Sequence, residues 1–450
     1  MRKSLLWIAA SGVALVAGQA QAVPAFSTQT GQPCNTCHVG SFGPELTAFG
    51  RNFKLGGYTL QGGTGTPIPV ALLALTSYTN TTKGVAGGAA PDFGTNGNFA
   101  VDQVSVFLAG RVNDYMGGFV QGTYSGVDKT FFLDNTDIRV TKDASVGDHD
   151  LQFGVSLNDS PQVEDVYNST YTWGYPFVFS ALSNTPAAGT LLGGTMAGNS
   201  LGAVAYGSLD HTYLLEAGAY DTQSPGFMKI FGEGYGAGAE TGVAPYMRAA
   251  YETDIGPASA HIGVTFLDSR FNPTVDTNTI ISSVGHDKYT DVSVDGGAQF
   301  VNNPVHQFTT NGMFTHESRR LDGTTALGGA MTPNGDLDEA RLTGTYYYND
   351  TYGFTASWHH LWGSRDAALY GQGNQYGSAN GSPNSNSYTV EADYVPFGKD
   401  SSWGSPFANL KIGVQYTMYT EFNGGTTNYD GVGSNASDNN TLYVFLWTLF

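Results

Sequence analysis

From about residue 67 to its end, the chain is built of segments in which apolar and polar side chains partly alternate. In the segment 150–158, for example, Leu151, Phe153, Val155 and Leu157 occupy every second position. Side chains of a β-strand point to opposite faces in turn, so this pattern predicts strands with one apolar and one polar face. Clusters of Gly, Asn, Asp, Pro and Ser separate the segments and predict turns.

About 16 such segments can be marked, an even number in the range of bacterial outer-membrane barrels. We therefore expect an all-β fold, an antiparallel outer-membrane β-barrel whose apolar face meets lipid and whose polar face lines a lumen. A soluble β-sandwich, in which the apolar face packs on a core, is the alternative. The expected strands cover 68–80, 99–112, 115–126, 131–141, 148–159, 200–209, 211–222, 244–256, 258–270, 286–301, 304–318, 337–349, 352–364, 386–398, 405–421 and 439–450.

Short and long links between these segments roughly alternate. Short periplasmic turns and long outer loops would produce this alternation in an outer-membrane barrel. The last segment ends on Phe450, which resembles the C-terminal signature of such barrels, so both chain ends should lie on the periplasmic side. The segment 160–199 is compatible with an inward constriction or an outward loop. Short links include Asn113-Asp114, Asp210 and Asn302-Asn303, and long ones include 160–199, 223–243, 271–285, 319–336 and 365–385.

Composition agrees with a membrane barrel rather than with a collagen-like or disordered chain. The 450 residues include 61 Gly, 26 Tyr and 26 Phe, which suit turns and interfacial aromatic girdles. The formal net charge of −19 argues against nucleic acid as a partner. This acidity either concentrates cations near the surface or merely keeps an exported protein soluble.

The first 22 residues have the features of a cleavable export signal. Arg2 and Lys3 precede an apolar core from Leu5 to Val16, and small residues surround the expected cleavage site after Ala22. Such a signal delivers the chain to the periplasm, where haem is attached to c-type motifs in bacteria. No other stretch approaches the length of a membrane-spanning apolar helix, so we expect none.

The strongest chemical motif is Cys34-Asn35-Thr36-Cys37-His38, which contains the only two cysteines of the chain. This spacing is typical of a covalent c-type haem site, in which two thiols attach the haem and the adjoining imidazole binds its iron. A redox-active cysteine pair would need a βαβ setting, and a zinc site would need further ligands that no nearby Cys or His supplies. We predict one covalent haem c on Cys34 and Cys37, with His38 as an axial iron ligand.

A short helix is expected after the motif, with Pro44 and Glu45 in its first turn and Gly56-Gly57 at its end. Leu46, Phe49 and Phe53 fall at helical spacing, so their shared face would pack on the haem or on the barrel wall.

Other residues of this segment suggest further roles. Gly50 would permit a close approach, and Arg51 and Lys54 could pair with haem propionates. The sixth iron ligand is open or water, Lys54, Tyr58, the new amino terminus, or a residue from the rest of the chain. A module of this size buries too little surface to hold a haem alone, so it should lean on the barrel that comes after it.

Within the expected barrel, alternation places His359 in the lumen and His360 at the lipid interface. His359 could serve electron or metal chemistry or be a plain polar residue of the lumen. Asp137 and Arg139, both expected in the lumen, could pair structurally or set pore selectivity. Outer-loop acids would attract cations or simply be solvated, and they include Asp322, Asp336, Asp366 and Asp430.

Several motifs between residues 24 and 58 carry a family resemblance, namely Pro24-Ala25-Phe26, Gln29-Thr30-Gly31, Cys34-x-x-Cys37-His38, Pro44-Glu45-Leu46, Phe49-Gly50-Arg51, Phe53-Lys54 and Gly57-Tyr58. Followed by a barrel, they resemble the fused outer-membrane cytochrome-porins of iron-oxidising bacteria, and 157–177 also looks like that family's barrel. The expected domains are a signal peptide at 1–22, a monohaem c-type cytochrome module at 23–66 and a porin-like barrel at 67–450. The resemblance implies a monohaem cytochrome fused to a porin of about 16 strands. It further implies electron transfer from extracellular Fe(II) to a periplasmic c-type cytochrome. Only Cys34, Cys37 and His38 carry over as site residues.

These observations lead to three candidate functions. The first is a redox conduit through the outer membrane, which would make the chain an Fe(II)-oxidising c-type cytochrome. The second is a diffusion porin whose haem module is a plug or sensor. The third is a haem enzyme acting on peroxide, which an open sixth position would favour.

Overall fold

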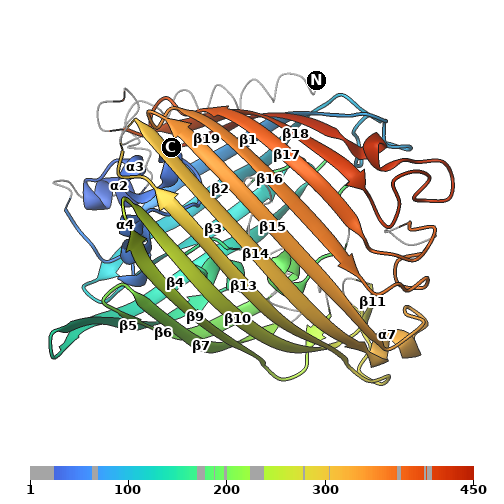
Figure 1. The fold of residues 1–450 in the computed structure, drawn as a ribbon, viewed down its shortest axis with the longest axis horizontal. Coiled ribbons are helices and arrows are strands. Elements are labelled where there is room, and N and C mark those ends of the chain that lie inside the picture. Colours follow the sequence, from blue (N-terminus) through green and yellow to red (C-terminus); the bar gives the residue numbers. More distant parts are fainter. Residues whose placement is uncertain are drawn as a thin grey trace, which may run out of the picture.

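The fold is a closed antiparallel β-barrel with helices inside one end (Figure 1). The computed structural model describes residues 25–62, 69–169, 178–186, 188–196, 200–222, 238–276, 279–303, 305–371, 377–399, 402 and 408–450. The expected export signal lies outside these residues. Each strand pairs with the next along the chain, and the barrel closes because β1 pairs with both β2 and β19.

Within the described residues, 16 long strands form the wall. They are β1 (Val70–Thr81), β2 (Asn98–Asn113), β3 (Met116–Ser125), β4 (Thr130–Val146), β5 (His149–Asn158), β6 (Ser200–Leu209), β7 (Tyr213–Thr222), β9 (Ala244–Ile255), β10 (Ala258–Asn272), β13 (Asp287–Phe300), β14 (His306–Leu321), β15 (Asn334–Tyr348), β16 (Tyr352–Gly363), β17 (Ser385–Tyr394), β18 (Asn409–Glu421) and β19 (Thr441–Leu449). Short elements in the loops are β8 (Ala239–Glu240), β11 (Thr274–Asp276), β12 (Thr279–Ile280), α7 (Asp322–Ala326) and η3 (Ala436–Asn439).

The sixteen expected strands are confirmed, with boundaries that differ by a few residues. The strand β4 continues to Val146, beyond the expected end at 141, because it pairs with β5 down to the turn at Gly147. Gly147 has a φ of +65°, a left-handed conformation that glycine adopts without strain.

The alternation also has the expected orientation. Phe153, Val155 and Leu157 are 41%, 44% and 47% exposed on the outside, while Ser156 and Asn158 are buried toward the lumen. An apolar exterior around a polar interior is the arrangement of a barrel that crosses a membrane, and the soluble sandwich is therefore wrong. The chain is a bacterial outer-membrane protein.

Short turns and long loops mark the two ends of the barrel. At the short-turn end, Leu72 and Phe450 exchange backbone hydrogen bonds of 2.8 and 2.9 Å, so the start and end of the barrel sequence adjoin. The long loops, with α7 and β11, lie at the opposite end (Figure 1). We assign the short-turn end to the periplasm and the long-loop end to the outside.

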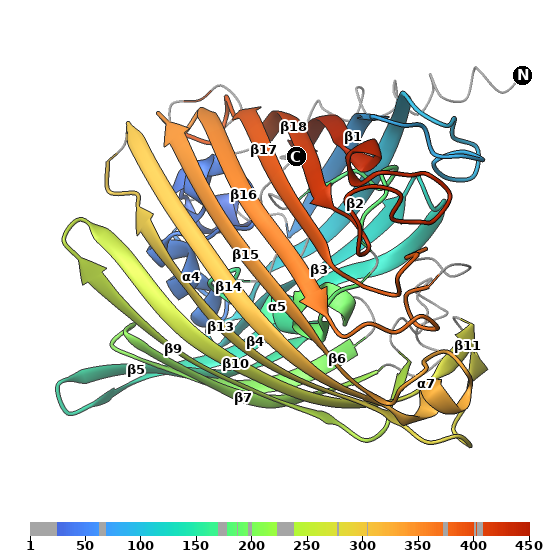
Figure 2. The ribbon, with the colours of Figure 1, turned by 45° about the vertical axis from the view of Figure 1, so that its right-hand side comes forward.

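The N-terminal segment folds into short helices within the periplasmic half of the barrel (Figure 2). Its elements are α2 (Ala25–Thr30), α3 (Cys34–Cys37), η1 (Val39–Ser41) and α4 (Ala48–Leu55). No helix among the described residues is long and apolar enough to cross a membrane.

This helical segment is held by strands from around the whole circumference. The Tyr58 hydroxyl donates to Asp137 on β4 at 2.7 Å, Arg51 pairs with Glu252 on β9, and Asn409 on β18 donates to the Ser41 carbonyl at 2.7 Å. The expectation that the module leans on the barrel is therefore confirmed.

The link after β5 folds inward in its described part. It contains α5 (Pro161–Glu164) and the turn η2 (Leu191–Thr195). The backbone N–H of Leu191 donates to Glu317 on β14 at 2.7 Å, and that of Leu192 donates to Asp291 on β13 at 2.9 Å. These carboxylates project into the lumen, so the inward alternative is confirmed for the described residues.

Candidate functional site

The cysteine motif forms a single helical turn, α3. The His38 N–H donates to the Cys34 carbonyl at 2.9 Å, which closes the turn. Residues three apart in a helix lie on the same face, so Cys34 and Cys37 point to one side and His38 lies beside them. Cys34, Cys37 and His38 all line one cavity, as the attachment of a c-type haem to this motif would require.

The turn is fixed against α4 by Thr47. The Thr47 hydroxyl donates to the Thr36 carbonyl at 2.6 Å and accepts the Gly50 N–H, which caps the helix. The Thr47 N–H donates to the Cys37 carbonyl at 3.0 Å. The helix therefore begins at Ala48, and the prediction of a first turn at Pro44 is wrong because Thr47 supplies the cap.

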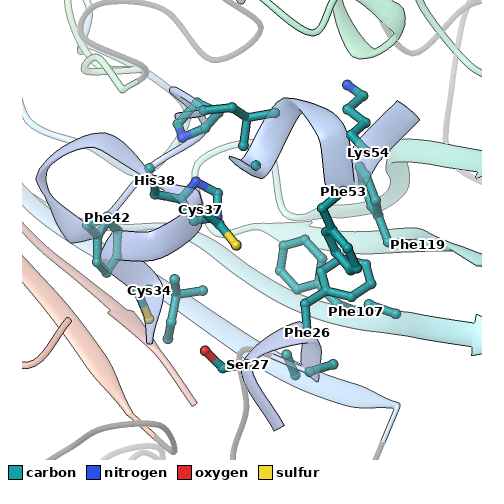
Figure 3. A pocket seen from close by; sticks show the side chains of 18 of the residues that line it. Phe26, Ser27, Cys34, Cys37, His38, Phe42, Phe53, Lys54, Phe107 and Phe119 are labelled. Atoms are coloured by element: carbon teal, nitrogen blue, oxygen red, sulfur yellow. The ribbon is translucent and has the colours of Figure 1, made fainter. Parts of the chain in front are cut away.

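The motif lines a cavity between the helical segment and the barrel wall. Figure 3 shows Cys34, Cys37, His38 and Phe42 along one side and a cluster of phenylalanines along the other. Strands β1 and β19 contribute apolar side chains to the lining, among them Leu73 and Trp447. The phenylalanines of the cluster are Phe26, Phe53, Phe107 and Phe119.

Close ring contacts hold this aromatic lining. The rings of Phe26 and Phe53 pack edge to face at 5.1 Å, and those of Phe42 and Trp447 do so at 4.9 Å. Such a cover limits the access of water to whatever occupies the cavity.

Of the three apolar residues expected on one helix face, Leu46 and Phe53 line the cavity and Phe49 does not. Phe49 is 37% exposed, because it lies in the first turn of α4 and helical side chains lean toward the N-terminus. The prediction for Phe49 is therefore wrong.

The two cations of α4 are bound to other groups. The Arg51 guanidinium pairs with Glu252 and donates to the Leu46 carbonyl at 2.8 Å, outside the cavity lining. Lys54 lines the cavity, but its ammonium donates to the Val163 carbonyl and points away from Cys37 in Figure 3. The structure therefore does not favour Arg51 as a partner of a haem propionate.

Burial keeps the motif uncharged. Desolvation lowers the pKa of His38 to about 4, although the backbone at Gly43 and Glu45 opposes the shift. The imidazole is therefore neutral near pH 7, the form in which a ring nitrogen can bind a metal ion. Burial and the neighbouring Cys34 raise the pKa of Cys37 to about 12.

The candidates for a second iron ligand differ in their availability. Among the described residues lining the cavity, none besides His38 is a His or Met. The Tyr58 hydroxyl is engaged with Asp137, and the Lys54 ammonium with Val163. Of the ligands considered from the sequence, Tyr58 and Lys54 are therefore engaged elsewhere, and the new amino terminus expected at Val23 lies outside the described residues.

Asn168 is a polar residue of the cavity that the sequence analysis missed. It is buried, and its Oδ1 has no hydrogen-bond partner within the described part of the chain. Asp165 holds the turn by accepting the backbone N–H of Tyr167 at 2.9 Å and of Ser169 at 2.7 Å. Asp commonly forms such turns by accepting hydrogen bonds from nearby backbone N–H groups, so Asp165 could have predicted a turn near Asn168. Nothing in the sequence shows that this turn faces the lumen.

The matches among known proteins concern the barrel. Comparison with protein-family models and with curated proteins finds no match. Among solved structures, the chain is similar at 12% identity to the anion-selective porin of Comamonas acidovorans, over 85% of this chain and 99% of that one with a TM-score of 0.44. The outer-membrane channel DcaP of Acinetobacter baumannii matches at 12% identity, over 85% and 96% with a TM-score of 0.44. Pseudomonas putida OprB matches at 12% identity, over 84% and 93% with a TM-score of 0.46.

The expected lumen residues of the barrel lie as the alternation places them. His359 Nε2 is 3.0 Å from Glu339 Oε1 in the lumen, and His360 stacks between Trp358 and Trp362 on the outside. The contact with Glu339 gives His359 a structural partner in the lumen.

The Asp137–Arg139 pair is confirmed as a structural contact. Asp137 and Arg139 pair at 2.9 Å, and both are fully buried. Arg139 also lies 3.2 Å from Glu164 on the inward link. The pair therefore joins the wall to α5.

The loop acids hold local structure. Asp322 pairs with Arg320 at 2.8 Å, and the Ser364 hydroxyl donates to Asp336. Asp366 and Asp430 accept backbone N–H groups of their own loops. These bonds favour local structural roles over a dedicated site for an incoming cation.

Proposed function

We propose that this chain is an outer-membrane electron conduit with one haem c bound covalently to Cys34 and Cys37 and with His38 as an axial iron ligand. The observation that carries the proposal is the single helical turn that sets both thiols and the imidazole on the wall of a largely apolar cavity. Bound there, the haem would supply reversible one-electron transfer. The phenylalanine cluster would exclude water, and Thr47 would keep the motif fixed against α4.

The position of the motif supports a periplasmic electron acceptor. The Asn35 side chain donates to Asp350, in the short turn between β15 and β16, at 3.1 Å. The Asn35 N–H donates to the carbonyl of Gly398, in the link between β17 and β18, at 3.2 Å. Both links are at the periplasmic end, so a soluble c-type cytochrome could approach the motif there.

The donor in this proposal is extracellular Fe(II), which the family resemblance implies. An external donor suits iron chemistry, because Fe(III) precipitates near neutral pH and oxidation outside keeps the product out of the cell. A barrel supplies a passage for electrons through an insulating membrane.

Anaerobic mixing of the purified haem protein with Fe(II) tests the proposal. Rapid appearance of the reduced haem spectrum is expected, and dithionite serves as the control that the haem is reducible. Proteoliposomes that enclose an oxidised soluble c-type cytochrome test the direction, because external Fe(II) should then reduce the enclosed protein. Failure of Fe(II) to reduce the haem at any pH at which the protein is folded would abandon the proposal.

A diffusion porin with the helical segment as a plug is the second candidate. The porin-like barrel and its polar, charged lumen favour it. Solute flux through protein-bearing liposomes separates the two functions. A porin passes small solutes at a high rate, whereas an electron conduit needs no solute flux. Turnover of peroxide would instead support the haem enzyme.

A further inference from the structure

Two carboxylates share one ammonium group on the inner wall of the barrel. Glu391 and Asp393 are on β17, and both side chains are buried on its lumen side. Lys411 on β18 places its ammonium 3.1 Å from Glu391 and 3.5 Å from Asp393. The side chains of Glu391, Asp393 and Lys411 are 0%, 0% and 5% exposed. One positive charge therefore faces two negative charges at a place that solvent hardly reaches.

The other titratable groups around the two carboxylates do not supply a second positive charge. The Tyr347 hydroxyl on β15 donates to Asp393 at 3.5 Å. Tyr443 on β19 interacts electrostatically with Glu391 on one side and with Asp102 of β2 on the other. Both phenols are neutral near pH 7. Among the described residues, no Lys, Arg or His besides Lys411 forms an ion pair with either carboxylate.

One oxygen of the pair has no hydrogen-bond donor. Asp393 Oδ1 is buried and accepts no hydrogen bond from any residue that the structure describes. Burying an ionised carboxylate without full compensation is costly, and the cost disappears when the group holds a proton. Two carboxylates at one site therefore tend to hold one proton between them.

Tyr347 connects the two carboxylates with the cysteine motif. Its ring packs against Gly40, two residues after His38, so closely that a Cβ added to Gly40 would overlap the ring. The Tyr347 hydroxyl, which donates to Asp393, also lies 3.4 Å from the Lys411 ammonium. A single side chain thus separates the charged groups from the motif segment.

Lys411 borders the motif's cavity from the barrel wall. It is directly opposite Trp447 on β19, and Trp447 lines the cavity. Asn409, two residues before Lys411 on the same face of β18, lines the cavity as well. A charge that enters the cavity would therefore act on Glu391 and Asp393 through a buried interior, where charges interact more strongly than in water.

We propose that Glu391 and Asp393 together bind one proton each time the haem of the proposed function is reduced, an inference that rests on that function. When one electron from the donor enters the cavity, one of the two carboxylates takes up one proton from water and forms an O–H bond. Asp393 is the last residue but one of β17, so the water is that of the periplasmic end. When the electron leaves for the periplasmic acceptor, the O–H bond breaks and the proton returns to water. The proton thus offsets the charge of the electron while both are in the protein.

Potentiometric titration of the haem in the detergent-solubilised full chain, with soluble mediators and over a series of pH values, tests the proposal. The reduction potential of the native chain should fall as pH rises, by up to about 59 mV for each tenfold drop in proton concentration. The E391Q and D393N variants should each have a nearly constant potential, because Lys411 then balances the one carboxylate that is left. At high pH their potentials should lie above that of the native chain, which keeps an extra negative charge, and at low pH the three should converge.

The D287N variant is the matched control. Asp287 is also a buried carboxylate of the lumen, but it accepts the Thr324 N–H at the opposite end of the barrel. Its loss should leave the pH dependence of the native chain unchanged. Heat-modified migration in electrophoresis confirms that each variant keeps a folded barrel.

Infrared difference spectra of the reduced and oxidised native chain supply a test that needs no variant. A carbonyl band of a protonated carboxyl group should appear on reduction, and it should be missing in E391Q and D393N. A native potential that does not change with pH, or one whose change survives in both variants, would overturn this inference and leave the electron conduit intact, as would a missing band. Absence of covalent haem would overturn the proposed function and this inference together.

Discussion

The α-carbon of Gly50 lies so close to the backbone carbonyl of Cys37 that an added Cβ would stand 2.2 Å from that oxygen. The same carbonyl accepts the Thr47 N–H at 3.0 Å, so it cannot turn aside without breaking the hydrogen bond that ties Thr47 to the motif. The helix and the cysteine motif are therefore packed backbone to backbone. This contact confirms the close approach expected at Gly50.

Gly50→Ala should push α4 away from the motif, because backbone contacts under 3.0 Å cannot be accommodated without a shift. Under the proposed function, this shift should lower the amount of covalent haem per chain severalfold. The ratio of Soret to protein absorbance measures the loss. Gly207→Ala is the matched control, since a Cβ there meets nothing within 4 Å. Full haem content in the Gly50 variant, with unchanged proteolysis of residues 25–62, would contradict the predicted strain.

Under the proposed function, Cys37→Ala should remove one thioether bond and leave little haem attached after denaturing electrophoresis, because the proposed attachment uses both thiols. Haem staining of the denatured band measures the bound cofactor. His38→Ala should instead keep the thiols but alter the visible spectrum, since it removes the axial imidazole. Covalent haem at full strength in the Cys37 variant would show that the cysteines are not the attachment site.

The strands could be predicted from the sequence because lipid outside and a polar lumen inside impose a strict alternation on each of them. The segment 150–158 shows this directly, since its apolar residues are the exposed ones and Ser156 and Asn158 are buried. The position of the helical segment could not be predicted in the same way. Asn35 and Asp350, for instance, are 315 residues apart in the chain, and no local pattern pairs them.

The cysteine motif could be recognised in the sequence, but the residues that line its cavity could not be predicted from it. Phe107 and Phe119 come from β2 and β3 and line the cavity only because the segment folds into the lumen. Asn168 reaches the cavity because its link turns inward, which the sequence left open. Tertiary placement of this kind depends on contacts that local periodicity does not encode.

Arg51→Gln should loosen the helical segment, because it leaves Glu252 without its cationic partner. The two side chains are 5% and 14% exposed, and breaking a buried pair costs about 3–5 kcal/mol. Hydrogen exchange of residues 48–55 should therefore accelerate strongly in the variant. Adding Glu252→Gln should restore much of the protection, since no uncompensated charge then remains. Equal exchange in the single and double variants would show that the charge of Glu252 does not matter.

Asp366 organises the outer loops through backbone donors. Its carboxylate accepts the N–H groups of Met331 and Ala368 at 2.7 and 2.9 Å, and it also accepts those of Thr332 and Leu369. Partial burial favours the neutral acid, but these donors outweigh it and hold the pKa of Asp366 below its usual range. A carboxylate with a lowered pKa stabilises the fold above its unfolded pKa, and the contribution disappears as pH falls through the folded pKa.

Asp366→Asn should therefore lower the hydrogen-exchange protection of these loop amides by roughly tenfold at pH 7, because hydrogen bonds to a charged acceptor are stronger than those to an amide. At a pH below the folded pKa of Asp366, the native chain should approach the variant, since its own carboxyl is then protonated. Protection factors corrected for the intrinsic exchange rate at each pH measure both effects. Asp148→Asn, at an exposed periplasmic turn, should change neither. A difference between native chain and Asp366 variant that persists undiminished in acid would show that the charge of this carboxylate is not what holds the loops.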